Sequence, residues 1–126
     1  MSSSELRYLI AIEDLSGQLK GIKQTDLATK LHVSKVSVYN AVEKLKEKGF
    51  IEKNERKIFL TKKGEEILDE YMVIIRFMAG HLSLHCGTRE KQAYEDALNA
   101  TCAFSDATRN GIARFIKSKR EIDSRE

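Results

Sequence analysis

The sequence has few of the residues on which disulfide bonding, catalysis or membrane insertion depends. Its two cysteines, Cys86 and Cys102, are too few for a disulfide framework, and such thiols are usually reduced and partly buried. Three histidines, without a nucleophile elbow, a phosphate-binding loop or a histidine–carboxylate motif, provide no set of residues for an enzyme active site. The longest apolar run, 72–78, is interrupted by Arg76 and is far too short to span a bilayer, and residues 1–5 lack the basic region of a secretory signal. We therefore expect a cytoplasmic protein that is not an enzyme and has no membrane partner.

Charge is unevenly distributed along the chain. The 126 residues are 41% hydrophobic and 33% charged, which is typical of a globular protein. Residues 1–63 hold 13 Lys and Arg against 8 Asp and Glu, whereas residues 64–126 hold 9 against 11. Because Lys and Arg drive association with nucleic acids by neutralising phosphates, the N-terminal half is the candidate for binding a polyanion. A lysine-rich solvated face would account equally well for the charge taken alone.

The first 49 residues have the pattern of three short helices. Apolar residues at three- and four-residue spacings predict one helix over 6–15 and another over 25–31, separated by a turn at 17–21. Ser34 is placed to cap a third helix, which Gly49 ends. The inward face of this third helix is predicted to consist of Val38, Ala41, Val42 and Leu45.

After Gly49 the pattern becomes extended. Phe50 and Ile51 lead into a first strand, residues 54–56 offer a turn, and residues 57–60 form a return strand. Helix, turn, capped helix and basic hairpin, in this order, are typical of a winged helix-turn-helix. The sequence thus predicts a DNA-binding domain over residues 1–63.

Side chains of the third helix and the hairpin are the candidates for contacting DNA. Asn40 can bond a base edge and Ser37 either a base or a phosphate, while the lysines suit phosphate contacts. The hairpin would flank the backbone or an adjacent minor groove. The predicted DNA-binding residues are Lys35, Ser37, Tyr39, Asn40, Lys44, Lys53, Arg56 and Lys57. The alternatives are that these are solvated surface side chains, or that the winged helix is a protein–protein interaction module.

Residues 64–126 are predicted to be helical throughout. Thr61 can cap a long amphipathic helix that Gly80 bends, a further helical stretch over 81–85 ends at Gly87, and helices follow over 90–102 and, capped by Ser105, as far as 116. The tail after Lys117 is expected to be frayed. Overall we expect a mainly α fold with a small β-hairpin, in which a helical dimerisation or effector domain follows the winged helix. The apolar run 67–78, with Leu82, Leu84, Leu98 and Phe104, favours a homodimer formed by these helices and part of the first helix.

The run over 25–51, TDLATKLHVSKVSVYNAVEKLKEKGFI, followed by LTKKG over 60–64, resembles the DNA-binding domain of the diphtheria-toxin-repressor family. Residues 8–15 are similar to the first helix of that family, and the order of helices after 64 is similar to its dimerisation and metal-sensing domain. The length of the chain resembles the two-domain manganese-regulator branch. The resemblance implies a homodimeric repressor that binds palindromic double-stranded operator DNA in response to manganese or iron.

The metal-ligand positions carried over from the family mostly hold residues that cannot bind a metal ion. They fall on Arg7, Ile10, Ile75 or Arg76, Leu98, Thr101 and Cys102, and Cys102 alone is a convincing ligand type. We therefore expect the usual site to be absent and DNA binding not to require manganese or iron. A rewired metal or redox site is the alternative, with His81, His85, Cys86 and Cys102 as weak candidates, although a histidine pair of this kind is more often surface or edge packing.

Overall fold

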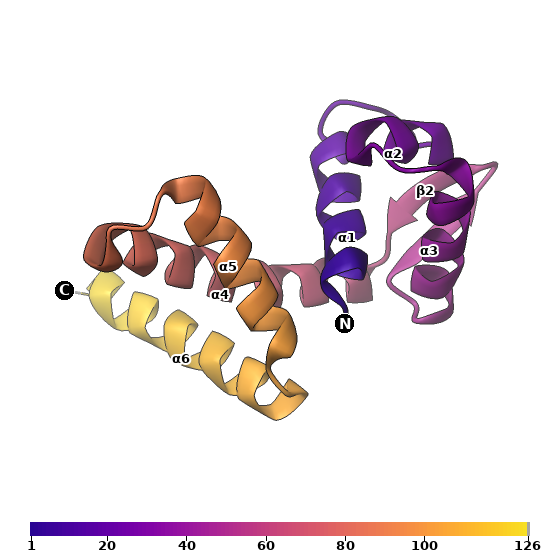
Figure 1. The fold of residues 1–126 in the computed structure, drawn as a ribbon. Helices are drawn as coiled ribbons and strands as arrows, with labels where there is room; N and C mark the ends of the chain where they lie inside the picture. Colours follow the sequence, from indigo (N-terminus) through magenta and orange to yellow (C-terminus); the bar gives the residue numbers. More distant parts are fainter. Residues whose placement is uncertain (126) are drawn as a thin grey trace. The chain divides into compact units, whose positions relative to one another are not determined.

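The computed structural model describes residues 1–125, and the side chains of residues 1–120. Along the chain in Figure 1 it contains α1 (Ser3–Ser16), α2 (Gln24–Leu31), α3 (Lys35–Glu47), β1 (Ile51–Asn54), β2 (Lys57–Leu60), α4 (Lys62–Cys86), α5 (Glu90–Ala103) and α6 (Asp106–Arg125). Two compact units, Met1–Leu68 and Asp69–Glu126, are called here the N-terminal unit and the C-terminal unit. The predicted mainly helical fold with one small hairpin is confirmed. No helix of the described residues is long and apolar enough to cross a membrane.

Three helices of the N-terminal unit share one apolar core. α1 begins at a capping box, in which the Ser2 hydroxyl accepts the Glu5 N–H at 3.1 Å, and the Glu5 carboxylate also bonds Lys48 at the end of α3. Burial would raise the pKa of Glu5, but the bonds from Lys48 and Ser2 hold it below its ordinary value of 4.5. Ala41, predicted to face inward, is half-buried, whereas seven other apolar side chains of these helices are fully buried: Leu6, Leu9, Ile12, Leu27, Val38, Val42 and Leu45.

A tight turn joins α2 to α3. His32 ends α2 in a left-handed conformation with φ of 55°, and its N–H donates to the Ala28 carbonyl. The Ser34 hydroxyl then accepts the Ser37 N–H at 3.1 Å, so Ser34 is the N-cap of α3. The predicted start of the third helix is therefore confirmed. This cap fixes where α3 begins and hence which of its side chains lie in its first turn.

The two strands form the wing. They are antiparallel, with Ile51 opposite Leu60 and Asn54 opposite Lys57, and the turn consists of Glu55 and Arg56. Both turn residues have positive φ, 51° and 68°, as a two-residue hairpin of the type I′ kind requires. The Ile58 N–H donates to the Ile22 carbonyl at 2.7 Å, which brings the wing to the segment just before α2.

The start of α4 packs closely on the chain that follows α3. The Thr61 hydroxyl accepts the Gly64 N–H at 3.0 Å and donates to the Gly49 carbonyl at 2.5 Å, so Thr61 caps α4 as predicted. Gly64 is buried, and a Cβ atom at this position would lie 2.0 Å from the Phe50 carbonyl oxygen. Only a residue without a side chain fits this contact.

α4 and α6 are longer than the sequence pattern indicated. The stretch over 81–85 continues α4, which runs unbroken through Gly80 to Cys86; an exposed glycine weakens a helix by only about 1 kcal/mol relative to alanine. The prediction that the tail after Lys117 is frayed is wrong as far as Arg125, where α6 ends. Lys, Arg and Glu have high helix propensity, so a helix can continue through them even where no apolar face marks it in the sequence. Glu126 lies outside the described residues. Val73, Ile74, Ala113 and Ile116 form the core between α4 and α6.

One arginine is buried in the C-terminal unit. The Arg109 side chain is 6% exposed; its Nη1 donates to Asp106 Oδ1 at 2.9 Å, and its Nε lies 3.5 Å from Glu70 Oε2. Its guanidinium carbon lies 4.6 Å from the centre of the Tyr71 ring. Burial raises the pKa of the Tyr71 phenol, and the charge of Arg109 opposes that rise. An internal cation thus bridges α4 and α6.

Candidate nucleic-acid interface

α3 presents a polar and partly apolar face opposite its buried face. The five predicted DNA-binding residues of this helix are all exposed: Lys35, Ser37, Tyr39, Asn40 and Lys44. The Ser37 hydroxyl bonds the Ser34 hydroxyl at 2.9 Å, so it belongs to the helix cap. Val36, which the sequence pattern did not single out, is 69% exposed, and Tyr39 is 53% exposed. An apolar side chain so exposed in the first turn of α3 is suited to contact with a thymine methyl group.

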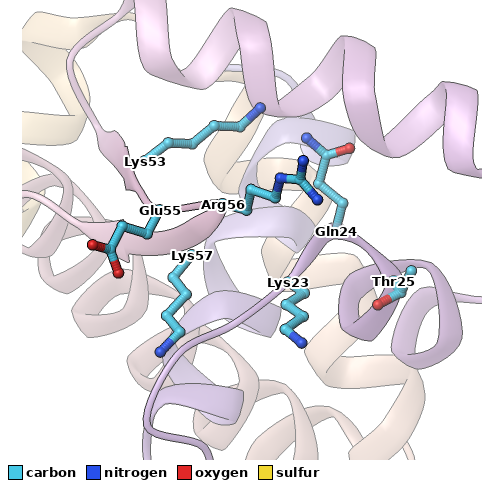
Figure 2. Close-up of a pocket in the computed structure, with 7 residues that line it drawn as sticks. All are labelled: Lys23, Gln24, Thr25, Lys53, Glu55, Arg56 and Lys57. Carbon is cyan, nitrogen blue, oxygen red and sulfur yellow. The ribbon is translucent and has the colours of Figure 1, made fainter.

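A cationic pocket of about 650 Å³ lies between the wing and the N-terminal end of α2. The residues around it are Lys23, Gln24, Thr25, Lys53, Glu55, Arg56 and Lys57, so the lining includes four cations and one carboxylate. In Figure 2, Arg56 extends toward Gln24, whereas Glu55 points away from it. α2 begins beside this pocket, and the partial positive charge of a helix N-terminus adds to that of the side chains. The pocket is chemically suited to a phosphodiester group.

The structure brings three predicted wing residues, Lys53, Arg56 and Lys57, together with Lys23, Gln24 and Thr25, which the sequence analysis missed. The sequence analysis missed them because their position depends on a contact between residues far apart in the chain. The wing reaches α2 through the bond between Ile58 and Ile22, and residues 36 positions apart give no local signal of that pairing. The one available hint was that Lys23 immediately precedes a predicted helix.

Lys53 is not a freely solvated wing cation. Its Nζ lies 3.3 Å from Glu43 Oε1 on α3 and 5.5 Å from the centre of the Tyr39 ring. Its side chain is 24% exposed, whereas Arg56 and Lys57 at the wing tip are exposed. The wing and the recognition helix are therefore joined by one ion pair.

The four weak candidates for metal ligands do not form a metal-binding cluster. His81 and His85 stack on α4 with ring centres 5.2 Å apart, and Phe77 packs on His81 at 4.5 Å, which is ordinary helix-surface packing. Cys86 is exposed and Cys102 is half-buried. Within the part of the chain that the structure describes, no three His, Cys, Asp or Glu side chains come close enough together to hold a metal ion.

The positions that correspond to the ligands of the family also fail to fit a transition metal. Ile75 and Leu98 are fully buried apolar side chains of the C-terminal unit. The buried Thr101 hydroxyl donates to the Ala97 carbonyl at 2.7 Å. Among these positions of the C-terminal unit, Cys102 alone has a side chain of a kind that binds transition metals well, and one ligand is too few for a resident ion.

The exposed face of α3, the basic wing and the cationic pocket between the wing and α2 are the features of a winged-helix DNA-binding domain. The family model "iron dependent repressor, N-terminal DNA binding domain" matches residues 1–58. This N-terminal domain is similar to the DNA-binding domain of the iron-dependent repressors, which agrees with the resemblance to the diphtheria-toxin-repressor family noted in the sequence.

Solved structures share the fold over both units. The metal-dependent transcriptional regulator MtsR is similar with a TM-score of 0.75 and 21% identity over 93% of this chain and 55% of its own. The manganese regulator SloR has a TM-score of 0.72 and 24% identity, over 90% of this chain and 53% of its own. The hypothetical protein SSo2273 from Sulfolobus solfataricus has a TM-score of 0.73 and 22% identity, over 92% of this chain and 89% of its own. The chain thus spans about half the length of the two regulators. No curated protein matches it in sequence.

Proposed function

We propose that the protein is a homodimeric repressor that reads palindromic DNA with α3 and the wing and does so without manganese or iron at the usual site of the family. The observation that carries the proposal is the exposed face of α3 beside a pocket with four cations. In this arrangement Asn40 and Val36 meet base edges in the major groove, while Lys23, Arg56 and Lys57 meet phosphates.

The dimer is supported by apolar side chains that the C-terminal unit leaves exposed. Leu84 is 77% exposed and Phe115 is 64% exposed, which is unusual for side chains of this size. Leu98, which the sequence analysis counted among the apolar residues of the interface, is fully buried inside the unit and belongs to its core instead. Pairing two half-site readers about one helical turn apart multiplies their specificity.

Variants of the interface test DNA reading. We expect Asn40→Ala to relax sequence preference at one operator position, a loss of about 1–3 kcal/mol of discrimination. We expect Arg56→Ala to weaken binding to all sequences alike and to reduce the slope of log affinity against log salt by about 1. Operator selection from random duplexes, followed by fluorescence anisotropy over a salt series, measures both effects.

Asn99→Ala and Arg89→Ala, two exposed positions on and before α5, are the matched controls. The surface assignment is wrong if the Asn40 and Arg56 variants bind as the controls do. Sedimentation of the complex with the selected operator reports the number of chains per duplex, and a single chain per palindrome contradicts the dimer.

Metal titration tests independence from manganese and iron. Metal-free protein is expected to bind its operator with an affinity that changes less than tenfold on adding either ion, because Ile75, Leu98 and Thr101 provide no free donor. A larger gain, above about 1.4 kcal/mol of coupling, would contradict this prediction. If such a gain disappeared in Cys102→Ala or in His81→Ala/His85→Ala, the protein would have a rewired site in place of the usual one.

A further inference from the structure

The pair between Glu43 and Lys53 lies on the surface that the proposed function assigns to DNA. Glu43 follows Asn40 by three residues and Val36 by seven, so all three share one face of α3. The Glu43 side chain is 36% exposed, and its carboxylate bonds the ammonium group of Lys53 from the wing. Among the four cations around the pocket, Lys53 has an ion pair, and the structure of the described residues gives none for Lys23, Arg56 or Lys57.

A lysine held by a carboxylate does not contribute to binding DNA in the same way as a solvated one. Nonspecific affinity arises from cations that replace the counterions of phosphates. While Lys53 is paired with Glu43 and packed over Tyr39, its charge is already neutralised and its side chain is directed toward α3. DNA that is bound nonspecifically at the pocket therefore meets three available cations there instead of four.

Seating of α3 in the major groove changes this balance. Carboxylates accept hydrogen bonds from the N4 amino group of cytosine, and Glu43 is on the face that would enter the groove. A base donor that takes over the Glu43 carboxylate releases Lys53, which already borders the cationic pocket, to a phosphate. A cytosine amino group lies within reach of Glu43 only when α3 is bound to its specific sequence.

We propose that Glu43 is a positioning residue that restrains Lys53 in the free protein and releases it to the DNA backbone when α3 engages its specific sequence. The proposal rests on the proposed function and assigns part of its specificity to one acidic side chain. Glu43 thereby lowers affinity for nonspecific DNA more than affinity for the operator.

Glu43→Gln is expected to raise affinity for a scrambled 30-base-pair duplex several-fold and to steepen the slope of log affinity against log salt by about 0.9, the value for one additional phosphate contact. Affinity for the selected operator should change less, so the specificity ratio falls. Lys53→Met alone should weaken binding to the operator more than binding to the scrambled duplex, because Lys53 is released to a phosphate only on the operator.

A double-variant cycle separates restraint of Lys53 from simple charge repulsion. In the Lys53→Met background no lysine can be released, so Glu43→Gln should raise affinity for the scrambled duplex less and should no longer steepen the salt slope by the amount of one phosphate contact. If the gain and the steepening are the same in both backgrounds, Glu43 acts by repelling phosphates and the proposal is overturned. Glu47→Gln removes the same charge from an exposed position one turn further along α3, and an equal gain from this control would likewise overturn it.

Failure of this proposal can be told apart from failure of the proposed function. If Asn40→Ala and Arg56→Ala leave binding to the selected operator unchanged, the DNA-binding surface itself is misassigned and the Glu43 proposal is lost with it. If those variants behave as expected while the Glu43 cycle shows no coupling to Lys53, the restraint alone is refuted. Circular dichroism spectra and thermal unfolding of each variant confirm that the compared proteins are folded.

Discussion

Gly64→Ala is expected to destabilise the N-terminal unit by about 3 kcal/mol, at the upper end of typical overpacking effects. The added Cβ would lie 2.0 Å from the Phe50 carbonyl oxygen and 2.9 Å from its carbonyl carbon. Because these are backbone atoms between α3 and β1, no rotamer change can relieve the clash. Urea unfolding followed by circular dichroism should show a lower midpoint with a similar slope.

Gly80→Ala is the matched control for this experiment, since both glycines lie within α4. No atom lies within 4 Å of a Cβ built at Gly80, and alanine favours the helix by about 0.5–1 kcal/mol over glycine. We therefore expect Gly80→Ala to be neutral or stabilising. Equal unfolding midpoints for the two variants would refute the assigned contact between Gly64 and Phe50.

Arg109→Met is expected to destabilise the C-terminal unit by about 3–5 kcal/mol, as removal of one partner from a buried ion pair does. Methionine retains much of the side-chain volume but leaves Glu70, which is 18% exposed, without the cation 3.5 Å away. The contact of the guanidinium with the Tyr71 ring is also lost. The loss should be visible in thermal and denaturant unfolding.

Two further variants identify the cause of that loss. Arg114→Met changes an exposed arginine of the same helix and should have little effect. Adding Glu70→Gln to Arg109→Met should restore part of the stability, because the carboxylate no longer remains charged without its partner. If the double variant is no more stable than Arg109→Met, the ion pair is not the source of the effect.

The parts of the fold that sequence analysis predicted depend on local signals. The cap at Ser34, the apolar spacing of α1 and α3, and the change to an extended pattern after Gly49 each specify a neighbouring element, and all were found. The lengths of α4 and α6 were underestimated because one exposed glycine and a charged tail are tolerated in helices. A boundary inferred from a single weak helix breaker is unreliable when the apolar face continues beyond it.

The candidate site was only partly predictable for the same reason. The spacing of Val38, Val42 and Leu45 gives the buried face of α3, so the exposure of Asn40 and Lys44 could be inferred. The proximity of Lys23 to the wing depends on the pairing of Ile22 with Ile58, and the restraint of Lys53 depends on Glu43 ten residues earlier in another element. Contacts of this kind leave no periodic pattern in the sequence.

The turn of the wing illustrates a trade-off between stability and activity. Glu55 and Arg56 adopt left-handed conformations that Asn-Gly would accept readily, and each such residue costs on the order of 1 kcal/mol. A redesign guided by turn propensities alone would replace this pair first and would remove Arg56 from the pocket. Engineering of a more heat-resistant variant should therefore leave the tip unchanged, because here the less favourable residue is the one that carries the charge.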